Sequence, residues 1–151
     1  MNYCHTQRAP LWAILVAVAV ALVLAPVLLG APNPAVLSLL GVGLLVAFVA
    51  FCLQTLTVRD EGTHLTLRYG PIPVFRHRIP YDAMTEAKRA RSSWIDGWGI
   101  HWAPGRGWIY NLWGFDCVEI RLGQKLVRVG TDDPDGLTRF LDAKIRGLGK
   151  T

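Results

Sequence analysis

The side chains that could catalyse a reaction are few and scattered along this sequence of 151 residues. Either Ser92 or Ser93 could be combined with Asp96 and His101 into a nominal hydrolytic triad, but no nucleophile-elbow motif surrounds either serine. The sequence also lacks a Walker phosphate-binding loop and a dinucleotide-binding glycine motif. We therefore predict that the protein is not an enzyme and that it binds no cofactor.

Residues that could bind a metal ion are equally dispersed. His64, His77 and His101 occur singly in strand-like segments, without the short spacing that zinc ligands require. The three cysteines contain no C-x-x-C pair, and Cys52 lies within an apolar run. We expect no metal site, and we expect unpaired thiols in a reducing compartment.

Residues 94–115 are rich in tryptophan, with five of the six in the chain. Tryptophan is enriched where proteins meet membranes or partners, because its ring is apolar and its N–H is polar. We hypothesise that this segment forms a hairpin that contacts a membrane or a partner protein. The alternative is that several of the rings fill the core. The residues proposed for the contact are Trp94, Trp98, Trp102, Arg106 and Trp108.

A second candidate surface is basic. The chain carries a formal charge of +5, and all of its acidic residues and all but one of its basic residues follow residue 56. Five cations in two strand-like segments are expected on neighbouring strands, either as a solvated face or as a face for anionic lipid headgroups or an acidic partner. Nucleic-acid binding is not expected, because base-stacking recognition motifs are absent. The five are Arg76, Arg78, Lys88, Arg89 and Arg91.

Two apolar runs must hold these surfaces in place. Residues 11–31 and 35–56 are each about twenty residues long, enough for a helix to cross a hydrocarbon core of about 30 Å. The connecting loop around Asn33 is uncharged, whereas Arg8 and the basic C-terminal part flank the other ends. By the positive-inside rule, both termini are expected in the cytoplasm. A cleavable signal peptide is not favoured, because the first run exceeds the usual apolar length of one.

Small residues recur at helical spacing in both apolar runs. They would let two backbones approach closely, so we hypothesise that the two faces pack together in a helical hairpin. The alternative is that alanine is simply common in apolar helices. The residues of this predicted packing face are Ala13, Ala17, Ala21, Ala25, Gly43 and Ala47.

From Leu56 onward the hydrophobic period changes to two. Strands are predicted at 56–59, 64–69, 75–79, 86–91, 100–102, 108–110, 117–122 and 125–130. In the second of these, Leu65 and Leu67 are expected to face a core and Thr66 to face water. A closing amphipathic helix is expected after a cap at Asp132 or Asp133.

The order of short strands and one closing helix resembles bacterial pleckstrin-homology-like domains that follow one or two membrane helices in inner-membrane proteins. The resemblance spans residues 56–148 and depends on Gly99-Ile100 before a Pro-Gly turn, on Val118-Glu119-Ile120, and on the segment 127–134 before a leucine-bearing helix. It implies an antiparallel β-barrel of about seven strands capped by one C-terminal α-helix, and a binding or scaffold module without catalysis. The loop that is basic in phosphoinositide-binding relatives is acidic here, at Asp60-Glu61-Gly62, so no ligand residues are transferred.

The sequence therefore predicts an α+β protein with a two-helix transmembrane anchor (1–56) and a cytoplasmic domain (57–151) at the bacterial inner (plasma) membrane. The leading functional hypothesis is a scaffold that recognises a protein partner. The second is a module that binds anionic lipid surfaces through the tryptophan hairpin and the basic strands. The third is an accessory subunit of a membrane enzyme complex. Homo-oligomerisation is left open.

Overall fold

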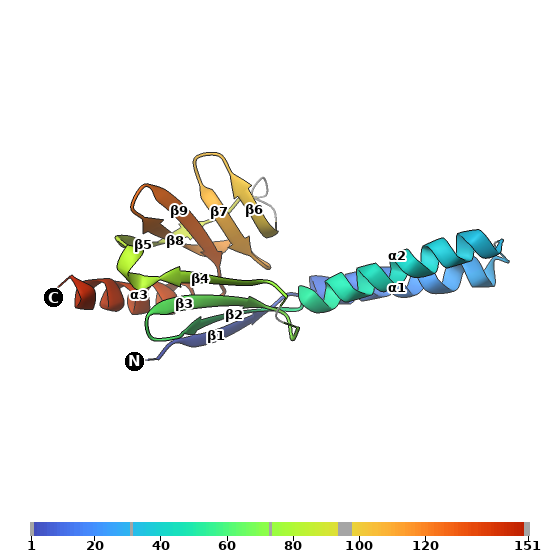
Figure 1. Cartoon of the computed structure of the whole chain (residues 1–151), viewed down its shortest axis with the longest axis horizontal. Coiled ribbons are helices and arrows are strands. Elements are labelled where there is room, and N and C mark those ends of the chain that lie inside the picture. The colour runs from blue at the N-terminus through green and yellow to red at the C-terminus, as the bar shows by residue number, and fades with distance from the viewer. Residues whose placement is uncertain (1, 31, 73, 94–97, 150–151) are drawn as a thin grey trace.

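The computed structural model describes residues 2–30, 32–72, 74–93 and 98–149, and it joins an apolar helical hairpin to a two-sheet domain (Figure 1). The predicted α+β class is confirmed. Helices α1 (Leu11–Leu28) and α2 (Asn33–Cys52) project from one end of the domain, and by length and composition each is able to cross a membrane. Both helices end a few residues before the predicted limits, and for α2 the reason is that residues 55–56 already belong to a strand. We call the end of the domain where α1 begins and α2 ends the helix end, and the opposite one the distal end.

The two helices pack against each other through Gly43. A Cβ atom on Gly43 would lie 2.8 Å from Cγ2 of Val23 and 3.1 Å from the carbonyl oxygen of Ala19. On α1 the buried residues are Ala19 and Pro26, while the predicted alanine ridge (Ala13, Ala17, Ala21 and Ala25) is exposed. At 3.6 residues per turn, Ala19 points to the side of the helix opposite Ala17 and Ala21. The ridge therefore does not make the predicted contact within the hairpin, and its role as a packing face for another chain stays a prediction.

The first sheet has the order β1-β2-β3-β4, and all of its strands are antiparallel to their neighbours. Its strands are β1 (Cys4–Arg8), β2 (Thr55–Asp60), β3 (His64–Tyr69) and β4 (Arg76–Pro80). Strand β1 was not predicted, because residues 4–8 are polar and their partner is distant in sequence. It pairs directly with β2, with Arg8 opposite Thr55. The helical hairpin is thus an insertion between two adjacent strands.

The second sheet has the order β5-β8-β9-β7-β6, in which only the β7–β9 pair is parallel. It follows a single 3₁₀ turn, η1 (Tyr81–Ala83). Its strands are β5 (Glu86–Arg91), β6 (Gly99–Ala103), β7 (Gly107–Asn111), β8 (Asp116–Leu122) and β9 (Lys125–Gly130).

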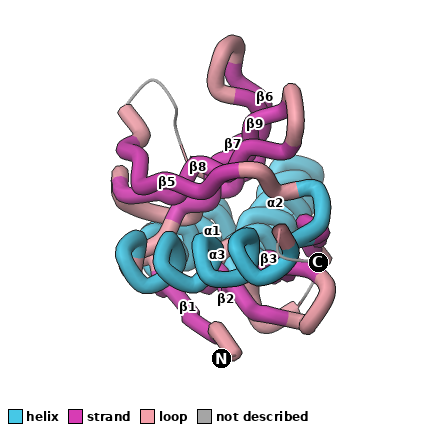
Figure 2. Tube along the Cα trace, turned by 90° about the vertical axis from the view of Figure 1, so that its left-hand side faces the viewer, coloured by secondary structure: helices cyan, strands magenta, loops and turns pink. Residues whose placement is uncertain are grey.

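The described strands form two open sheets rather than the predicted closed barrel. Strands β4 and β5, which follow one another in sequence, belong to different sheets and do not pair. Figure 2 shows the first sheet below the second, with helix α3 (Pro134–Leu148) running between them. The pleckstrin-homology-like fold therefore stays a prediction.

The core lies between the sheets and under α3. Leu65 and Leu67 are fully buried, as predicted, but so is Thr66, which lies in register between Arg59 and Arg78 on the outer face. Helix α3 begins as predicted, with Asp133 accepting a hydrogen bond from the backbone N–H of Gly136 at 3.0 Å. Its buried Leu137 and Leu141 join the core.

Candidate binding site

The structure separates the described tryptophans of residues 94–115 into two pairs. Trp98 and Trp113 are half-buried and stack with their ring centroids 4.6 Å apart. Trp102 and Trp108 lie opposite each other in the β6–β7 hairpin, with 59% and 48% of their surfaces exposed. None of these four is fully buried, so the rings border the core rather than fill it. Trp94 lies outside the described residues.

The first pair belongs to the helix end. A small cavity of about 80 Å³ there is bordered by Leu11 and Trp12 of α1, by Leu53 just after α2, and by Trp98 and Leu112 from the domain. Trp12 itself is 36% exposed. Three of the chain's tryptophans thus gather where the helices meet the domain, at the level that an aromatic belt occupies in membrane proteins.

The second pair borders an open groove of about 610 Å³ between the two sheets, which we call the tryptophan groove. One side is formed by His77 and Arg78 of β4, and the other by the β6–β7 hairpin and the β8–β9 turn. The large side chains that line the groove include His77, Arg78, Trp102, Trp108, Lys125 and Leu126.

Aromatic rings line the inside of this groove. The His77 ring stacks on Tyr110 with centroids 4.6 Å apart, and Trp108 stacks on the same tyrosine at 6.4 Å. Burial lowers the pKa of His77 and raises the pKa of Tyr110, so in both rings it favours the uncharged form. The exposed side chains of Arg78 and Lys125 stand at the rim. The site can therefore hold apolar or aromatic groups inside and acidic groups at its edge.

Strand β6 adds backbone groups to this site. It is the last strand of its sheet, and among the described strands it pairs only with β7. The other edge of such a strand presents N–H and C=O groups that can pair with an additional strand. A hairpin with one edge that pairs with no described strand and two exposed tryptophans on one face is suited to an extended peptide.

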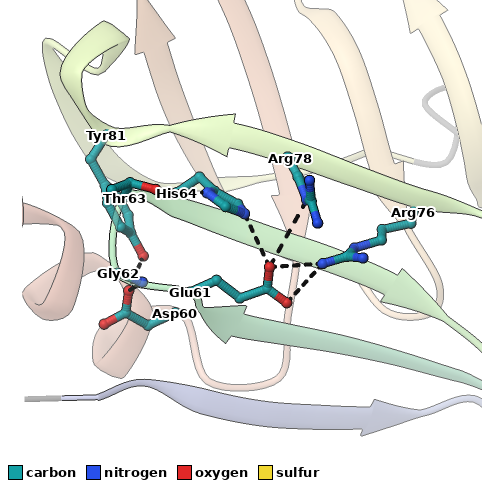
Figure 3. Close-up of polar contacts among 8 residues, drawn as sticks. All are labelled: Asp60, Glu61, Gly62, Thr63, His64, Arg76, Arg78 and Tyr81. Carbon is teal, nitrogen blue, oxygen red and sulfur yellow. Dashed lines mark hydrogen bonds and ion pairs between the residues drawn. The ribbon is translucent and has the colours of Figure 1, made fainter.

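The predicted basic surface is divided by the fold. Arg76 and Arg78 lie on β4 of the first sheet, whereas Lys88, Arg89 and Arg91 lie on β5 of the second, so the prediction of neighbouring strands is not met. Figure 3 shows Arg76 and Arg78 turned toward Glu61.

Most of these basic side chains have acidic partners. Arg76 donates to Glu61 at 2.7 Å, and Lys88 lies 3.2 Å from Glu119. Arg89 lies 3.2 Å from Asp135. Ion pairs of this kind leave little net positive charge for anionic lipid.

Arg106, expected at the tip of the hairpin against lipid phosphate, is half-buried and donates a hydrogen bond to Ser93 at 3.2 Å.

The acidic β2–β3 turn lies at the distal end (Figure 1), where it has a structural role. Asp60 is buried, with 2% of its side chain exposed, and accepts hydrogen bonds from the backbone N–H of Gly62 and the Tyr81 hydroxyl, both at 2.9 Å. Lys144 of α3 lies 3.0 Å from its other oxygen. Burial alone would raise the pKa of Asp60, but these three donors lower it below its usual value. Sequence reasoning missed this cluster, because its members come from three separate elements.

The residues considered for catalysis do not assemble within the described chain. Ser92 is buried and its hydroxyl faces the Cys117 sulfur at 3.6 Å, while Asp96 lies outside the described residues. Across the described ranges, no group of three or more histidine, cysteine, aspartate or glutamate residues could hold a metal ion.

Comparison of the chain with protein-family models, with curated proteins and with solved structures finds no match. The class of protein that the structure itself defines is an α+β domain with a pair of apolar helices inserted in one sheet.

Proposed function

We propose that this chain is a membrane-anchored, non-catalytic binding module whose tryptophan groove and β6 edge bind an extended segment of a partner protein. The observation that supports the proposal is the exposed pair Trp102 and Trp108, opposite each other beside a free sheet edge. Exposed tryptophans next to a groove are the residues that most often dominate binding energy.

The chemistry of the groove indicates what kind of segment fits. Backbone pairing with β6 would give affinity without sequence preference, while the rings of Trp102 and Trp108 would select apolar or aromatic side chains. Lys125 at the rim would favour a segment that also carries acidic residues, whereas Arg78 already lies 3.9 Å from Glu61.

The cellular setting of the proposal is the cytoplasmic face of the bacterial inner membrane. The uncharged loop between the helices and the basic residues on the other side support this orientation. The β1–β2 pairing agrees with both ends of the hairpin being on one side, because strands that pair must lie on the same side of the bilayer. The predicted pleckstrin-homology-like module is part of the same proposal.

A second candidate, an accessory subunit of a membrane complex, is favoured by one observation. The alanine ridge on α1 is exposed rather than packed against α2. Small-residue ridges of this spacing are suited to contact with another transmembrane helix. The two candidates are compatible, since one concerns the groove and the other the hairpin.

Site-specific photo-crosslinking in the producing cells tests the groove directly. A benzophenone amino acid in place of Trp102 in the full chain is expected to give one discrete protein adduct, and Trp108→Ala in the same chain is expected to reduce its yield by about tenfold or more. The matched control places the probe at Thr85, which is exposed next to the other edge of the sheet. Equal adducts from both positions, or an adduct insensitive to Trp108→Ala, would contradict the proposal.

A further inference from the structure

The β3–β4 loop exposes three apolar side chains close together in sequence. Ile72, Val74 and Phe75 are 46%, 52% and 45% exposed. Their backbone is held by two hydrogen bonds, from Val74 N–H to the Ile72 oxygen at 2.8 Å and from Tyr69 N–H to the Phe75 oxygen at 3.0 Å. Exposed apolar side chains this close together are unfavourable in water and indicate a surface that covers them.

The loop starts against the last turn of α2. The N–H of Gly70 donates to the carbonyl oxygen of Thr55 at 2.7 Å. A Cβ atom on Gly70 would lie 2.5 Å from the carbonyl oxygen of Cys52 and 2.7 Å from that of Phe51. Figure 1 shows the β3–β4 connection at the helix end of the domain. The three apolar side chains thus follow directly from the point where α2 stops.

The end of α2 that Gly70 approaches also exposes apolar side chains. Phe48 and Phe51 in the last turns of α2 are 49% and 52% exposed. A helix of 20 residues is about 30 Å long, so the end of α2 coincides with the boundary of a hydrocarbon core that it crosses. A loop in contact with that end is at the depth of the interface.

The charges around the loop suit lipid headgroups. No acidic residue occurs in the sequence between Glu61 and Asp82. Arg68 lies near the end of β3, two residues before the loop begins at Gly70, and Arg8 ends β1 just before α1. Cations beside an apolar tip are the usual arrangement of segments that enter a bilayer interface.

We propose that the β3–β4 loop inserts Ile72, Val74 and Phe75 into the interface of the same bilayer that α1 and α2 cross. The proposal rests on the membrane anchoring stated under the proposed function. With this third contact the domain cannot swing about its connections to the helices, so the tryptophan groove is kept at a fixed orientation to the membrane surface. The loop is thus a positioning element for partner binding.

Fluorescence quenching by nitroxide lipids measures this insertion. The full chain carries Cys4→Ser, which removes the exposed cysteine, and an environment-sensitive fluorophore on Val74→Cys, in phosphatidylcholine–phosphatidylglycerol vesicles. Two matched positions are labelled separately: Leu44→Cys, 62% exposed in the middle of α2, and Asp82→Cys, exposed at the distal end. A headgroup-level nitroxide is expected to quench the Val74 probe several-fold more than the Asp82 probe. A deep nitroxide is expected to quench the Leu44 probe.

The outcomes separate this inference from the anchoring on which it rests. A quenched Leu44 probe with Val74 quenched no more than Asp82 overturns the loop insertion alone. An unquenched Leu44 probe overturns the membrane anchoring itself. Adding Ile72→Ser and Phe75→Ser is expected to lower quenching at Val74 several-fold and to leave quenching at Leu44 unchanged. Unchanged quenching at Val74 in that variant would contradict a role for these side chains.

Discussion

The two ends of the domain are held together by different physical means. At the distal end, the buried carboxylate of Asp60 joins a turn, a 3₁₀ turn and α3 through Gly62, Tyr81 and Lys144. At the helix end, contacts are apolar or depend on close backbone approach, as between Gly70 and Cys52. Polar groups are satisfied within the chain at one end, and apolar groups are left exposed at the other.

This difference agrees with the proposed loop insertion, in which the distal end faces water and the helix end faces lipid. In water, the exposed side chains of Ile72, Val74 and Phe75 on a loop surface would be unfavourable. The same side chains are favourable where α1 and α2 enter a bilayer. The contrast can be tested by disrupting each end separately.

The largest effect is expected at the distal end, from Asp60→Ala. The substitution leaves the Tyr81 hydroxyl, the Gly62 N–H and the Lys144 ammonium without their acceptor, which costs about 3 kcal/mol. The thermal midpoint of the full chain in detergent should fall by about 12 °C or more, since 1 kcal/mol corresponds to about 4–8 °C for a domain of this size. The exposed Asp82, changed to alanine, is the control and should shift the midpoint by no more than about 3 °C. Equal shifts would mean that Asp60 does not connect the three elements.

At the helix end, Gly70→Ala is expected to cost about 2 kcal/mol or more. Gly70 has a φ of +64°, and the added Cβ would meet the carbonyl oxygen of Cys52 at 2.5 Å. Gly62 is a matched control, because its φ is +83° but nothing lies within 4 Å of an added Cβ. Gly62→Ala should therefore cost only the backbone strain, about 1 kcal/mol. If thermal unfolding showed the same loss for both, the close approach of the loop to α2 would not matter to stability.

The smallest effect is expected in how the thermal midpoints of Asp60→Ala and Gly70→Ala depend on pH. The pKa of Asp60 is lowered in the fold, so the stability that its charge contributes is present above the unfolded value of about 3.9 and is lost as pH falls through the folded value. The gap in thermal midpoint between the unsubstituted chain and Asp60→Ala should shrink below about pH 4. The gap for Gly70→Ala should stay constant over the same range. A constant gap for both variants would show that the Asp60 charge is not part of the distal contacts.

Local patterns in the sequence were sufficient for most of the elements. Alternation placed β3, β5 and β9 at their observed limits, and the predicted cap, which the structure places at Asp133, marked the start of α3. Each of these depends on residues that are neighbours along the chain. The pairing of the strands into two open sheets does not depend on neighbouring residues alone. The parallel β7–β9 contact, for example, joins strands that are separated in sequence by β8.

The candidate sites likewise depend partly on residues that are neighbours in sequence and partly on contacts between distant segments. The tryptophan content pointed to residues 94–115, but only the fold shows that Trp98 belongs to the helix end and Trp102 to a groove. Strand β1 was missed because its partner follows after both helices, and the loop at Ile72 was missed because its significance comes from contact with α2. Arg76 and Lys88 were grouped by sequence proximity, yet they lie in different sheets.

The central claim is that a membrane-spanning hairpin is inserted between β1 and β2. Both ends of the hairpin then lie on the same side of the membrane as the domain. Labelling with a membrane-impermeant maleimide in sealed vesicles of known orientation tests this claim directly. Cys4 is exposed on β1, and Cys52 and Cys117 are buried, so the unsubstituted chain reports on β1. Asn33→Cys in a Cys4→Ser chain reports on the exposed start of α2. We predict that the two positions react from opposite sides, with Cys4 on the cytoplasmic one; reaction of both positions from the same side would contradict the account.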